Sequence, residues 1–359
     1  MRHSFVLAAL AASALAVVSL PSQAQVGFTR WEGHTAQPLT LVYPTAATST
    51  PTVMGPFTLD VALDAPPSPG KRPLILLSHG TGGNPLPDHD LAATLVRAGF
   101  VVAQLTHAGD NHLDTSRAGP ESFRLRPQEA TEALDALAAD PVWSDRLNLS
   151  RVGVHGMSAG GVTALSLAGG QWRLLDLLKH CHANLEADKG FCLNGALTPE
   201  QQTARAASYQ RAASAPERWL PAELTTFHGG RPASSPGSDP RPDPRIASVT
   251  AAVPVAAIYS PESLARIRVP VGLVTATHDE VLVPQFHSQH VLAHCTSCTL
   301  LSPLPGGHFD LLSPWPASVA STAAAQQVRG GSVTPGFDPA IRQAAHARMA
   351  AFHRQNLMP

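Results

Sequence analysis

Short apolar runs alternate with helix-forming segments along most of the chain, and this alternation restricts the possible folds more than any other feature. The run Pro73–Ser78 is apolar at nearly every position, as in a strand with both faces buried. Segments with apolar residues at helical spacing separate such runs, and several end at a Gly or before a Pro. The repeated order of strand and helix predicts an α/β fold with a mostly parallel central sheet flanked by helices.

The same criteria locate the individual elements. The predicted strands are Phe28–Glu32, Leu39–Tyr43, Phe57–Leu63, Pro73–Ser78, Phe100–Thr106, Arg151–His155, Ala247–Ala257, Val269–Thr275 and Thr299–Leu304. The predicted helices are Asp90–Ala98, Gln128–Ala139, Gly161–Ala168, Pro261–Ile267, Pro284–His294 and Pro339–Gln355.

The alternation stops between about residues 170 and 245. This stretch holds two of the four cysteines, a polar helical segment near Pro199–Ala213, and a run rich in Gly, Pro, Ser and Asp over Gly229–Pro244. We therefore expect residues 25–359 to form a single α/β domain with an insertion at about 170–245. Insertions over the C-terminal edge of such a sheet often form lids or walls of ligand clefts.

The first 24 residues resemble a secretory signal peptide. Arg2 and His3 precede the apolar run Phe5–Leu20, and Ser22-Gln23-Ala24 provides small residues for cleavage after about Ala24. A membrane anchor is the alternative, but sixteen apolar residues are fewer than the roughly 20 that span a bilayer. The mature protein is expected to be periplasmic or secreted, without a stable membrane span.

The four cysteines form two local pairs in the sequence, Cys181 with Cys192 and Cys295 with Cys298. Four cysteines allow three pairings, and we expect the local one. In the chain-entropy model these disulfides would stabilise the fold by about 3 and about 2 kcal/mol. A redox C-x-x-C motif at Cys295–Cys298 is the alternative, but this segment follows a predicted helix rather than beginning one, which favours a structural disulfide.

The charges of the chain are balanced, with 25 Lys and Arg against 26 Asp and Glu and a formal net charge of −1. A protein that binds nucleic acid through a broad basic surface needs a surplus of Lys and Arg. Nucleic acid is therefore not an expected partner.

Gly156-Met157-Ser158-Ala159-Gly160 matches the G-x-S-x-G pattern of a nucleophile elbow. The motif alone is weak, but an apolar strand precedes it and a helix of small residues follows, as the elbow requires. Such a turn lifts the Ser158 hydroxyl above the sheet, beside the backbone N–H of Ala159. A Gly-rich turn with a capping serine is the alternative.

A serine hydroxyl needs a base to become nucleophilic, and that base needs an orienting carboxylate. His308 lies after the last predicted strand, where the order serine, acid, histidine places the base. His107 also follows a strand, but it precedes Ser158 in the chain, which favours a hydrogen-bonded loop histidine. Asp279 is the preferred acid, because it follows the strand Val269–Thr275; Glu280 is an alternative, and Asp310 is a weaker candidate.

A metal-dependent enzyme is a different interpretation of the same region. His287, His290, His294 and Cys295 are spaced so that they share one face of a predicted helix. No carboxylate or second cysteine pair completes this set as a zinc site, so we do not expect a metal.

The residues that carry these motifs resemble the α/β-hydrolase superfamily. The resemblance is to bacterial dienelactone-hydrolase-like proteins related to plasma-type platelet-activating-factor acetylhydrolases. The matching stretches cover over half of the mature chain and are Pro73–Asn84, Leu91–Asp110, Arg126–Gly170, Asp243–Pro284 and Gly306–Asp310.

The resemblance implies the α/β-hydrolase fold and a Ser158–His308–Asp279 triad. It places the acid at Asp279, although an extra residue before Pro284 keeps Glu280 open. It also implies that the backbone N–H groups of Thr81 and Ala159 form the oxyanion hole. Dienelactone hydrolases typically use a cysteine nucleophile, so Ser158 implies ester hydrolysis by an acyl-enzyme route.

The expected substrate is a small-molecule, lipid or polymeric ester, and hydrolysis by a serine nucleophile with a histidine base needs no metal or organic cofactor. Amidase, thioesterase, and polyester or polyamide depolymerase activities stay open on the same fold, as does a non-catalytic binding protein.

Overall fold

The structure is a computed structural model that describes residues 25–196, 198–214, 227–228, 242–322 and 333–358. The expected signal peptide, residues 1–24, lies outside the described residues, as does the greater part of the Gly229–Pro244 run. No helix in the described part of the chain is long and apolar enough to cross a membrane.

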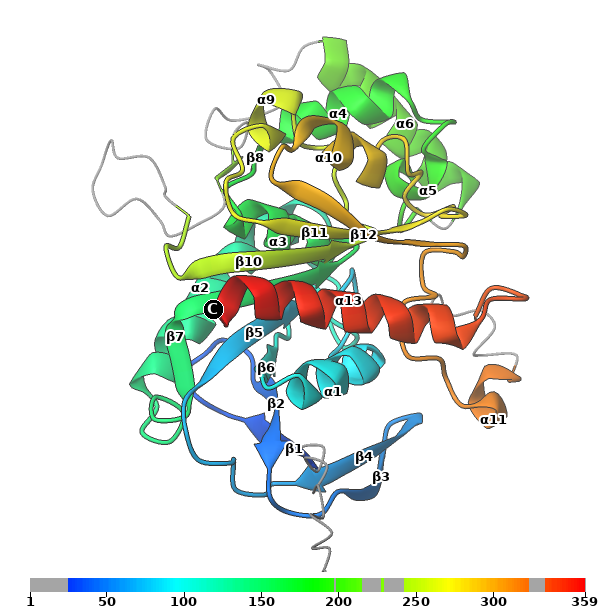
Figure 1. The fold of residues 1–359 in the computed structure, drawn as a ribbon. Coiled ribbons are helices and arrows are strands. Elements are labelled where there is room, and N and C mark those ends of the chain that lie inside the picture. Colours follow the sequence, from blue (N-terminus) through cyan, green and yellow to red (C-terminus); the bar gives the residue numbers. More distant parts are fainter. Residues whose placement is uncertain (1–24, 197, 215–226, 229–241, 323–332, 359) are drawn as a thin grey trace, which may run out of the picture.

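Ten strands form one twisted sheet in the order β12-β11-β10-β7-β5-β6-β2-β1-β4-β3 (Figure 1). The six strands from β12 to β6 are parallel, and β2 pairs antiparallel with both β6 and β1. The bounds are β1 Gln25–Trp31, β2 Leu39–Thr45, β3 Thr50–Met54, β4 Phe57–Leu63, β5 Arg72–Ser78, β6 Val101–Gln104, β7 Leu147–Met157, β10 Ile246–Ala252, β11 Val271–Ala276 and β12 Cys298–Leu304.

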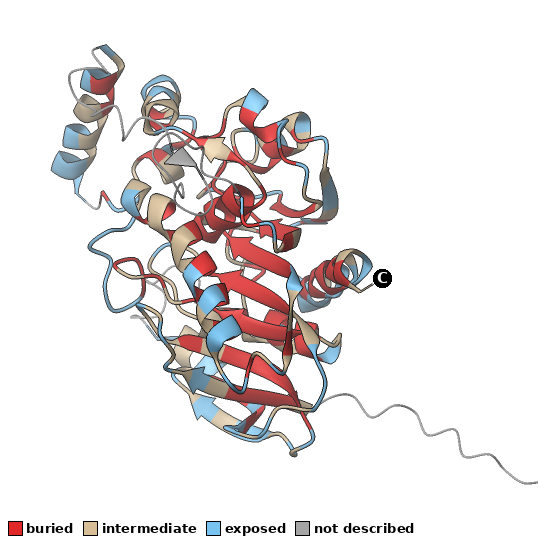
Figure 2. Cartoon of the chain, turned by 90° about the vertical axis from the view of Figure 1, so that its left-hand side faces the viewer, coloured by how far each residue is buried: buried red, intermediate tan, exposed pale blue. Residues whose placement is uncertain are grey.

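Helices cover both faces of this sheet (Figure 1), because its central strands carry apolar side chains on both sides. On one face, α1 (His89–Arg97) and α13 (Pro339–Leu357) enclose one hydrophobic core. On the other face, α2 (Pro120–Ala139) and α3 (Ala159–Leu167) enclose a second core. Figure 2 shows the central strands as a continuous buried layer between them. The predicted open, mostly parallel sheet flanked by helices is confirmed.

The predicted insertion contains three helices that lie together at the β12 end of the sheet (Figure 1). They are α4 (Leu174–Ala183), α5 (Lys189–Cys192) and α6 (Pro199–Ser214). Two short strands, β8 (Gln171–Trp172) and β9 (Phe227–His228), pair antiparallel beside them.

Both predicted disulfides are present. Cys181 is bonded to Cys192, which connects α4 to α5, and Cys295 is bonded to Cys298. The second bond joins the end of α10 (Ser288–His294) to the first residue of β12. Each bond therefore fixes a helix to the element that follows it.

Some predicted boundaries are wrong. The helix expected at Gln128 begins at Pro120 and continues through Pro127, although a proline usually ends a helix. The helix expected from Pro284 begins only at Ser288, because residues before it form a turn. The helix Pro261–Ile267 is only one turn, α9 (Pro261–Leu264). Strand β3 was not predicted.

Candidate active site

Ser158 occupies a strained turn between β7 and α3. Its φ of 56° and ψ of −117° lie outside the regions that ordinary L residues favour. The turn is held by neighbouring backbone: the Ser158 N–H donates to the Ala252 carbonyl, and the Val255 N–H donates to the Ser158 carbonyl. Ser158 as a whole is only partly buried, and it lies at the C-terminal edge of the sheet.

The glycines around Ser158 are required by close backbone contacts. A Cβ on Gly156 would overlap the Gly160 carbonyl, and a Cβ on Gly160 would overlap the carbonyl oxygen of Ser78 in β5. A Cβ on Gly161 would overlap Pro254. The G-x-S-x-G motif therefore forms the sharp strand-to-helix turn that the sequence predicted.

The loop after β5 runs directly beside Ser158. A Cβ placed on Gly80 would lie 3.4 Å from the Ser158 Cβ and 3.8 Å from its Oγ. Thr81 follows in this loop, and Ala159 is the first residue of α3. Within the described residues, neither the Thr81 nor the Ala159 backbone N–H has a hydrogen-bond partner. Both N–H groups belong to segments that border Ser158, and unpartnered donors of this kind are what an oxyanion hole requires.

Asp279 and His308 are joined at the same edge of the sheet. Asp279 follows β11 and His308 follows β12, so parallel pairing brings the two loops together. Their side chains are buried, and 2.7 Å separates His308 Nδ1 from Asp279 Oδ2. The other oxygen, Asp279 Oδ1, accepts the N–H groups of Val281 and Leu282. These bonds fix the carboxylate so that it can hold one orientation of the imidazole.

His308 Nε2 has no hydrogen-bond partner among the described residues, and none links it to Ser158 Oγ. The expected base, His308, is thus hydrogen-bonded to the expected acid, Asp279. The expected nucleophile, Ser158, lies at the same sheet edge but forms no hydrogen bond with His308 in this structure. Such bonds are often long without substrate.

The two other candidate acids have different surroundings. Glu280 is exposed, whereas Asp279 is buried. Asp310 is buried, but its carboxylate accepts the N–H groups of Gly307 and Thr334. Asp310 therefore stabilises the loop that carries His308 and does not contact the imidazole through a hydrogen bond.

A buried ion pair that the sequence analysis missed supports the loop at Thr81. Arg126 Nη2 lies 2.7 Å from Asp110 Oδ2, and both side chains are almost wholly buried. The guanidinium also donates to the carbonyls of His79 and Gly80, while Asp110 Oδ1 accepts the Gly82 N–H. Burial lowers the pKa of Arg126, and the Asp110 charge opposes this effect. Asp110 lies in the loop after β6 and Arg126 lies in α2, and the sequence predicted a role for neither.

His107 is a hydrogen-bonded loop histidine, as favoured from the sequence. Its Nε2 lies 2.7 Å from Ser78 Oγ, and its Nδ1 lies 2.6 Å from Glu129 Oε2. Burial, followed by the nearby Arg126 charge, lowers the pKa of His107 well below its usual value. Ser78 is itself buried. This arrangement therefore fixes the end of β5 and is not open to a substrate.

The residues of the alternative metal site have other partners. His287 Nε2 lies 2.9 Å from Asp188 Oδ2, and its Nδ1 accepts the Ala256 N–H. His290 bonds the Tyr259 carbonyl. Because Nδ1 of His287 faces an N–H donor, the proton must be on Nε2, which excludes Nε2 as a metal ligand in this arrangement.

In a second possible metal-binding cluster, one of the ligand atoms also has another partner. His180, Asp188 and Cys192 offer ligand atoms within 4.8 Å of one another, but the Cys192 sulfur is bonded to Cys181. A disulfide sulfur is not a thiolate, so this group lacks its third ligand.

Comparison with known proteins concerns the fold of the chain. No protein-family model and no curated protein matches the chain. The chain is similar in structure to a ferulic acid esterase from Streptomyces cinnamoneus, with a TM-score of 0.58 and 18% sequence identity. The similarity covers 95% of this chain and 92% of that esterase. The chain has the α/β-hydrolase fold.

At this identity the similarity concerns the fold and not the chemistry. The Ser158 turn lies between a central parallel strand and the helix that follows it, which is the position of the nucleophile elbow in α/β-hydrolases. The fold predicted from the sequence is thus confirmed, and the roles of individual residues rest on the geometry described above.

Proposed function

We propose that the protein is a serine hydrolase that cleaves carboxylic esters through Ser158, His308 and Asp279. The observation that carries the proposal is the strained Ser158 turn beside two unpartnered N–H groups, with the Asp279–His308 pair at the same edge. Within the α/β-hydrolases, the sequence most resembles dienelactone-hydrolase-like and platelet-activating-factor acetylhydrolase-like enzymes. The protein of similar structure is itself described as a ferulic acid esterase, which agrees with the proposed class of reaction.

In the proposed mechanism, His308 Nε2 takes the hydroxyl proton while Ser158 Oγ attacks the ester carbonyl. The N–H groups of Thr81 and Ala159 stabilise the oxyanion, which can contribute about 3–4 kcal/mol per donor. Collapse of the tetrahedral intermediate expels the alcohol, which receives its proton from His308. Water then attacks the acyl-enzyme by the same route and releases the acid. The Asp279 carboxylate stabilises the imidazolium that forms at each step.

We further propose that residues 1–24 are a signal peptide cleaved after about Ala24 and that residues 25–359 form one domain with the insertion as a lid or cleft wall. The two disulfides are compatible with an extracellular location. Small-molecule, lipid and polymeric esters are the candidate substrates, and esters of aromatic acids join them because of the structural neighbour.

A fluorophosphonate probe tests the proposed nucleophile. The wild type should be labelled, Ser158→Ala should not be labelled, and the exposed Ser150→Ala should behave as the wild type. A wild type that is not labelled, or labelling that survives in Ser158→Ala, would refute the proposal.

Activity measurements then separate the candidate substrates. We expect p-nitrophenyl esters to be hydrolysed, and a panel of chain lengths, a feruloyl ester, a polyester and a peptide would rank them. Activity that survives a strong chelator but is lost in His308→Ala would exclude the metal-dependent alternative.

A further inference from the structure

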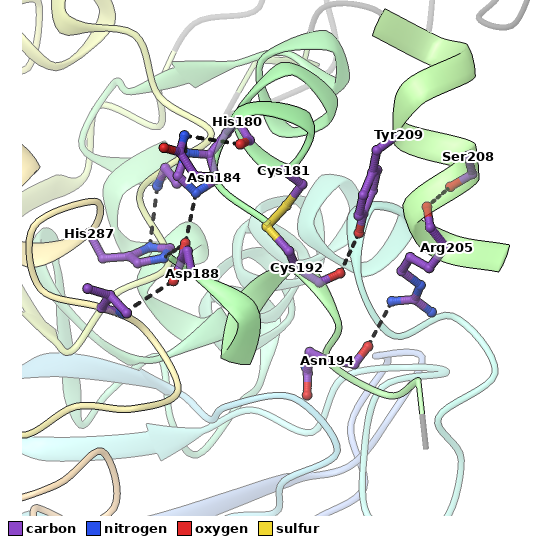
Figure 3. Close-up of a disulfide and its surroundings, with 12 residues drawn as sticks. His180, Cys181, Asn184, Asp188, Cys192, Asn194, Arg205, Ser208, Tyr209 and His287 are labelled. Atoms are coloured by element: carbon purple, nitrogen blue, oxygen red, sulfur yellow. Dashed lines mark hydrogen bonds and ion pairs between the residues drawn. A yellow bond between two sulfur atoms is a disulfide. The ribbon is translucent and has the colours of Figure 1, made fainter. Parts of the chain in front are cut away.

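One buried carboxylate outside the candidate triad connects the insertion to the loop that carries Asp279. We propose that Asp188 is a positioning residue, which holds the acid loop (residues 279–283) in the geometry that presents Asp279 to His308. This inference rests on the proposed function for its consequence in catalysis. The region is drawn in Figure 3.

Asp188 is wholly buried and accepts hydrogen bonds from three separate segments. Its Oδ2 accepts Nε2–H from His180 of α4 at 2.8 Å and from His287, which precedes α10, at 2.9 Å (Figure 3). Its Oδ1 accepts the N–H of Val283, the last residue of the acid loop, at 3.3 Å. One carboxylate thus binds the insertion, the acid loop and the residue before α10.

The tautomers of both histidines are set by their second ring nitrogens. His287 Nδ1 accepts the Ala256 N–H at 3.0 Å, and His180 Nδ1 faces the Asn184 amide at 3.3 Å. Both imidazoles can therefore donate Nε2–H to Asp188 while neutral. Burial alone would raise the pKa of Asp188, but the bonds from His180 and His287 outweigh it and lower the pKa to about 2.

The backbone N–H groups of the acid loop are divided between two carboxylates. Those of Val281 and Leu282 bond Asp279 Oδ1, at 2.9 and 2.8 Å, and the next one, of Val283, bonds Asp188. Asp279 Oδ2 is left to bond His308. Val283 directly follows the two residues whose N–H groups orient Asp279. Movement of Val283 away from Asp188 would therefore also move those two N–H groups.

A second contact between the insertion and the acid loop involves no charge. A Cβ on Gly190 in α5 would overlap the Glu280 carbonyl oxygen and lie 2.7 Å from that of Val281. The helix backbone therefore packs directly against the acid loop. The segment is closed by the Cys181–Cys192 bond, and within it the Cys192 N–H donates to the Asp188 carbonyl at 3.0 Å.

These contacts give the insertion a role in aligning the triad in addition to any contact with substrate. A small displacement of a catalytic group lowers the rate of chemistry by up to about 100-fold without removing substrate contacts. Loss of Asp188 should therefore lower kcat and leave KM almost unchanged.

The test uses Asp188→Asn and Gly190→Ala in the full mature chain, with Asp176→Asn as the matched control. In the first variant the introduced amide N–H₂ would face the two histidine donors. In the second, the added Cβ would displace the acid loop without altering charge. Asp176 lies in the same insertion, but it pairs with Arg173 and does not contact the acid loop. We measure kcat and KM on a p-nitrophenyl ester and amide hydrogen exchange of peptides covering residues 279–287.

We expect kcat to fall 10- to 100-fold in both variants, KM to stay within about two-fold, and exchange over 279–287 to accelerate. Asp176→Asn should match the wild type in all three. If Asp188→Asn does not fold, Gly190→Ala decides alone. Unchanged exchange, unchanged kcat, or a rise in KM at constant kcat would overturn the proposal. A wild type that neither labels nor hydrolyses esters would instead refute the proposed function, and the exchange data would still decide whether Asp188 holds the loop.

Discussion

Asp279 and Glu280 are adjacent carboxylates with opposite surroundings, which makes them a matched pair for mutagenesis. Asp279 is buried against His308, whereas Glu280 is exposed. We expect Asp279→Asn to lower kcat by about 10⁴-fold, because an amide favours the wrong imidazole tautomer. Glu280→Gln should change kcat less than two-fold. Steady-state kinetics on a p-nitrophenyl ester measure both values, and equal losses in the two variants would contradict the assignment of the acid.

We expect substitution of Asp110 to act first on the free energy of unfolding and only then on the catalytic rate. Asp110→Asn would leave the buried Arg126 guanidinium without its counter-charge. Removing one partner of a buried ion pair typically costs about 3–5 kcal/mol of unfolding free energy. Urea denaturation should show a loss of this order, while the exposed Asp114→Asn should cost less than about 1 kcal/mol. A loss below about 1 kcal/mol for Asp110→Asn would mean that the pair does not hold the Thr81 loop.

Single residues differ in how far the sequence alone could identify them. Ser158, Asp279 and His308 were proposed because each follows a predicted strand, and parallel strands bring their C-terminal ends to one edge. Asp188 and Arg126 had no such signal, because they lie in or next to helices. One histidine partner of Asp188, His287, is 99 residues away in the sequence. Long-range polar contacts of this kind depend on packing that no local pattern encodes.

At the scale of elements, the two disulfides offer a direct comparison. The Cys181–Cys192 bond closes a longer loop than Cys295–Cys298, with sequence separations of 11 and 3. In the chain-entropy model, replacing each pair by serines should cost about 3 and about 2 kcal/mol of unfolding free energy, respectively. Denaturant unfolding of the two double-serine variants measures the difference. Equal costs, or the reverse order, would show that native-state contacts outweigh loop entropy here.

Element type was more predictable than element ends. The central strands were found from their apolar runs, and α3 and α13 from small or periodic residues. The start of α2 was missed because a proline usually limits a helix, whereas this helix accommodates Pro127 in its interior. Strand β3 was missed because three of its five residues are exposed, so it lacks the apolar alternation of a half-buried strand.

For the whole molecule, buried neutral histidines predict a loss of stability in acid. Burial lowers the pKa of His353 from 6.5 to about 3. Between these values the unfolded chain binds a proton that the folded protein does not, so stability falls as pH falls. This residue should contribute about 1.4 kcal/mol per pH unit over that window and nothing above it.

The contribution of His353 can be isolated by substitution. His353→Gln keeps polar atoms near Ser248 and Thr250, which bond the imidazole, but cannot titrate. Urea unfolding between about pH 7.5 and 4.5 should show a shallower pH dependence than the wild type, by roughly 1 kcal/mol per pH unit below about 6.5. Parallel curves for the two proteins would show that the pKa of His353 is nearly the same in the folded and unfolded states.

The architecture as a whole was the most predictable property, because the alternation of strand and helix spans nearly the entire chain. Two hydrophobic cores, one on each face, follow directly from strands that are apolar on both sides. The arrangement of the insertion was not predictable, since a disulfide, a buried carboxylate and a glycine contact hold it in place, and none of these follows from a repeating sequence pattern.

The strained backbone at Ser158 has a practical consequence for anyone handling the protein. Contacts with β5, β7 and β10 hold the turn in that conformation. If any of these strands unfolds, the Ser158 backbone returns to an unstrained conformation. Under the proposed function, Ser158 of a partly folded molecule does not react with substrates or with covalent serine reagents. Titration with a covalent serine reagent would therefore count correctly folded molecules in a preparation, whereas absorbance or staining counts every chain.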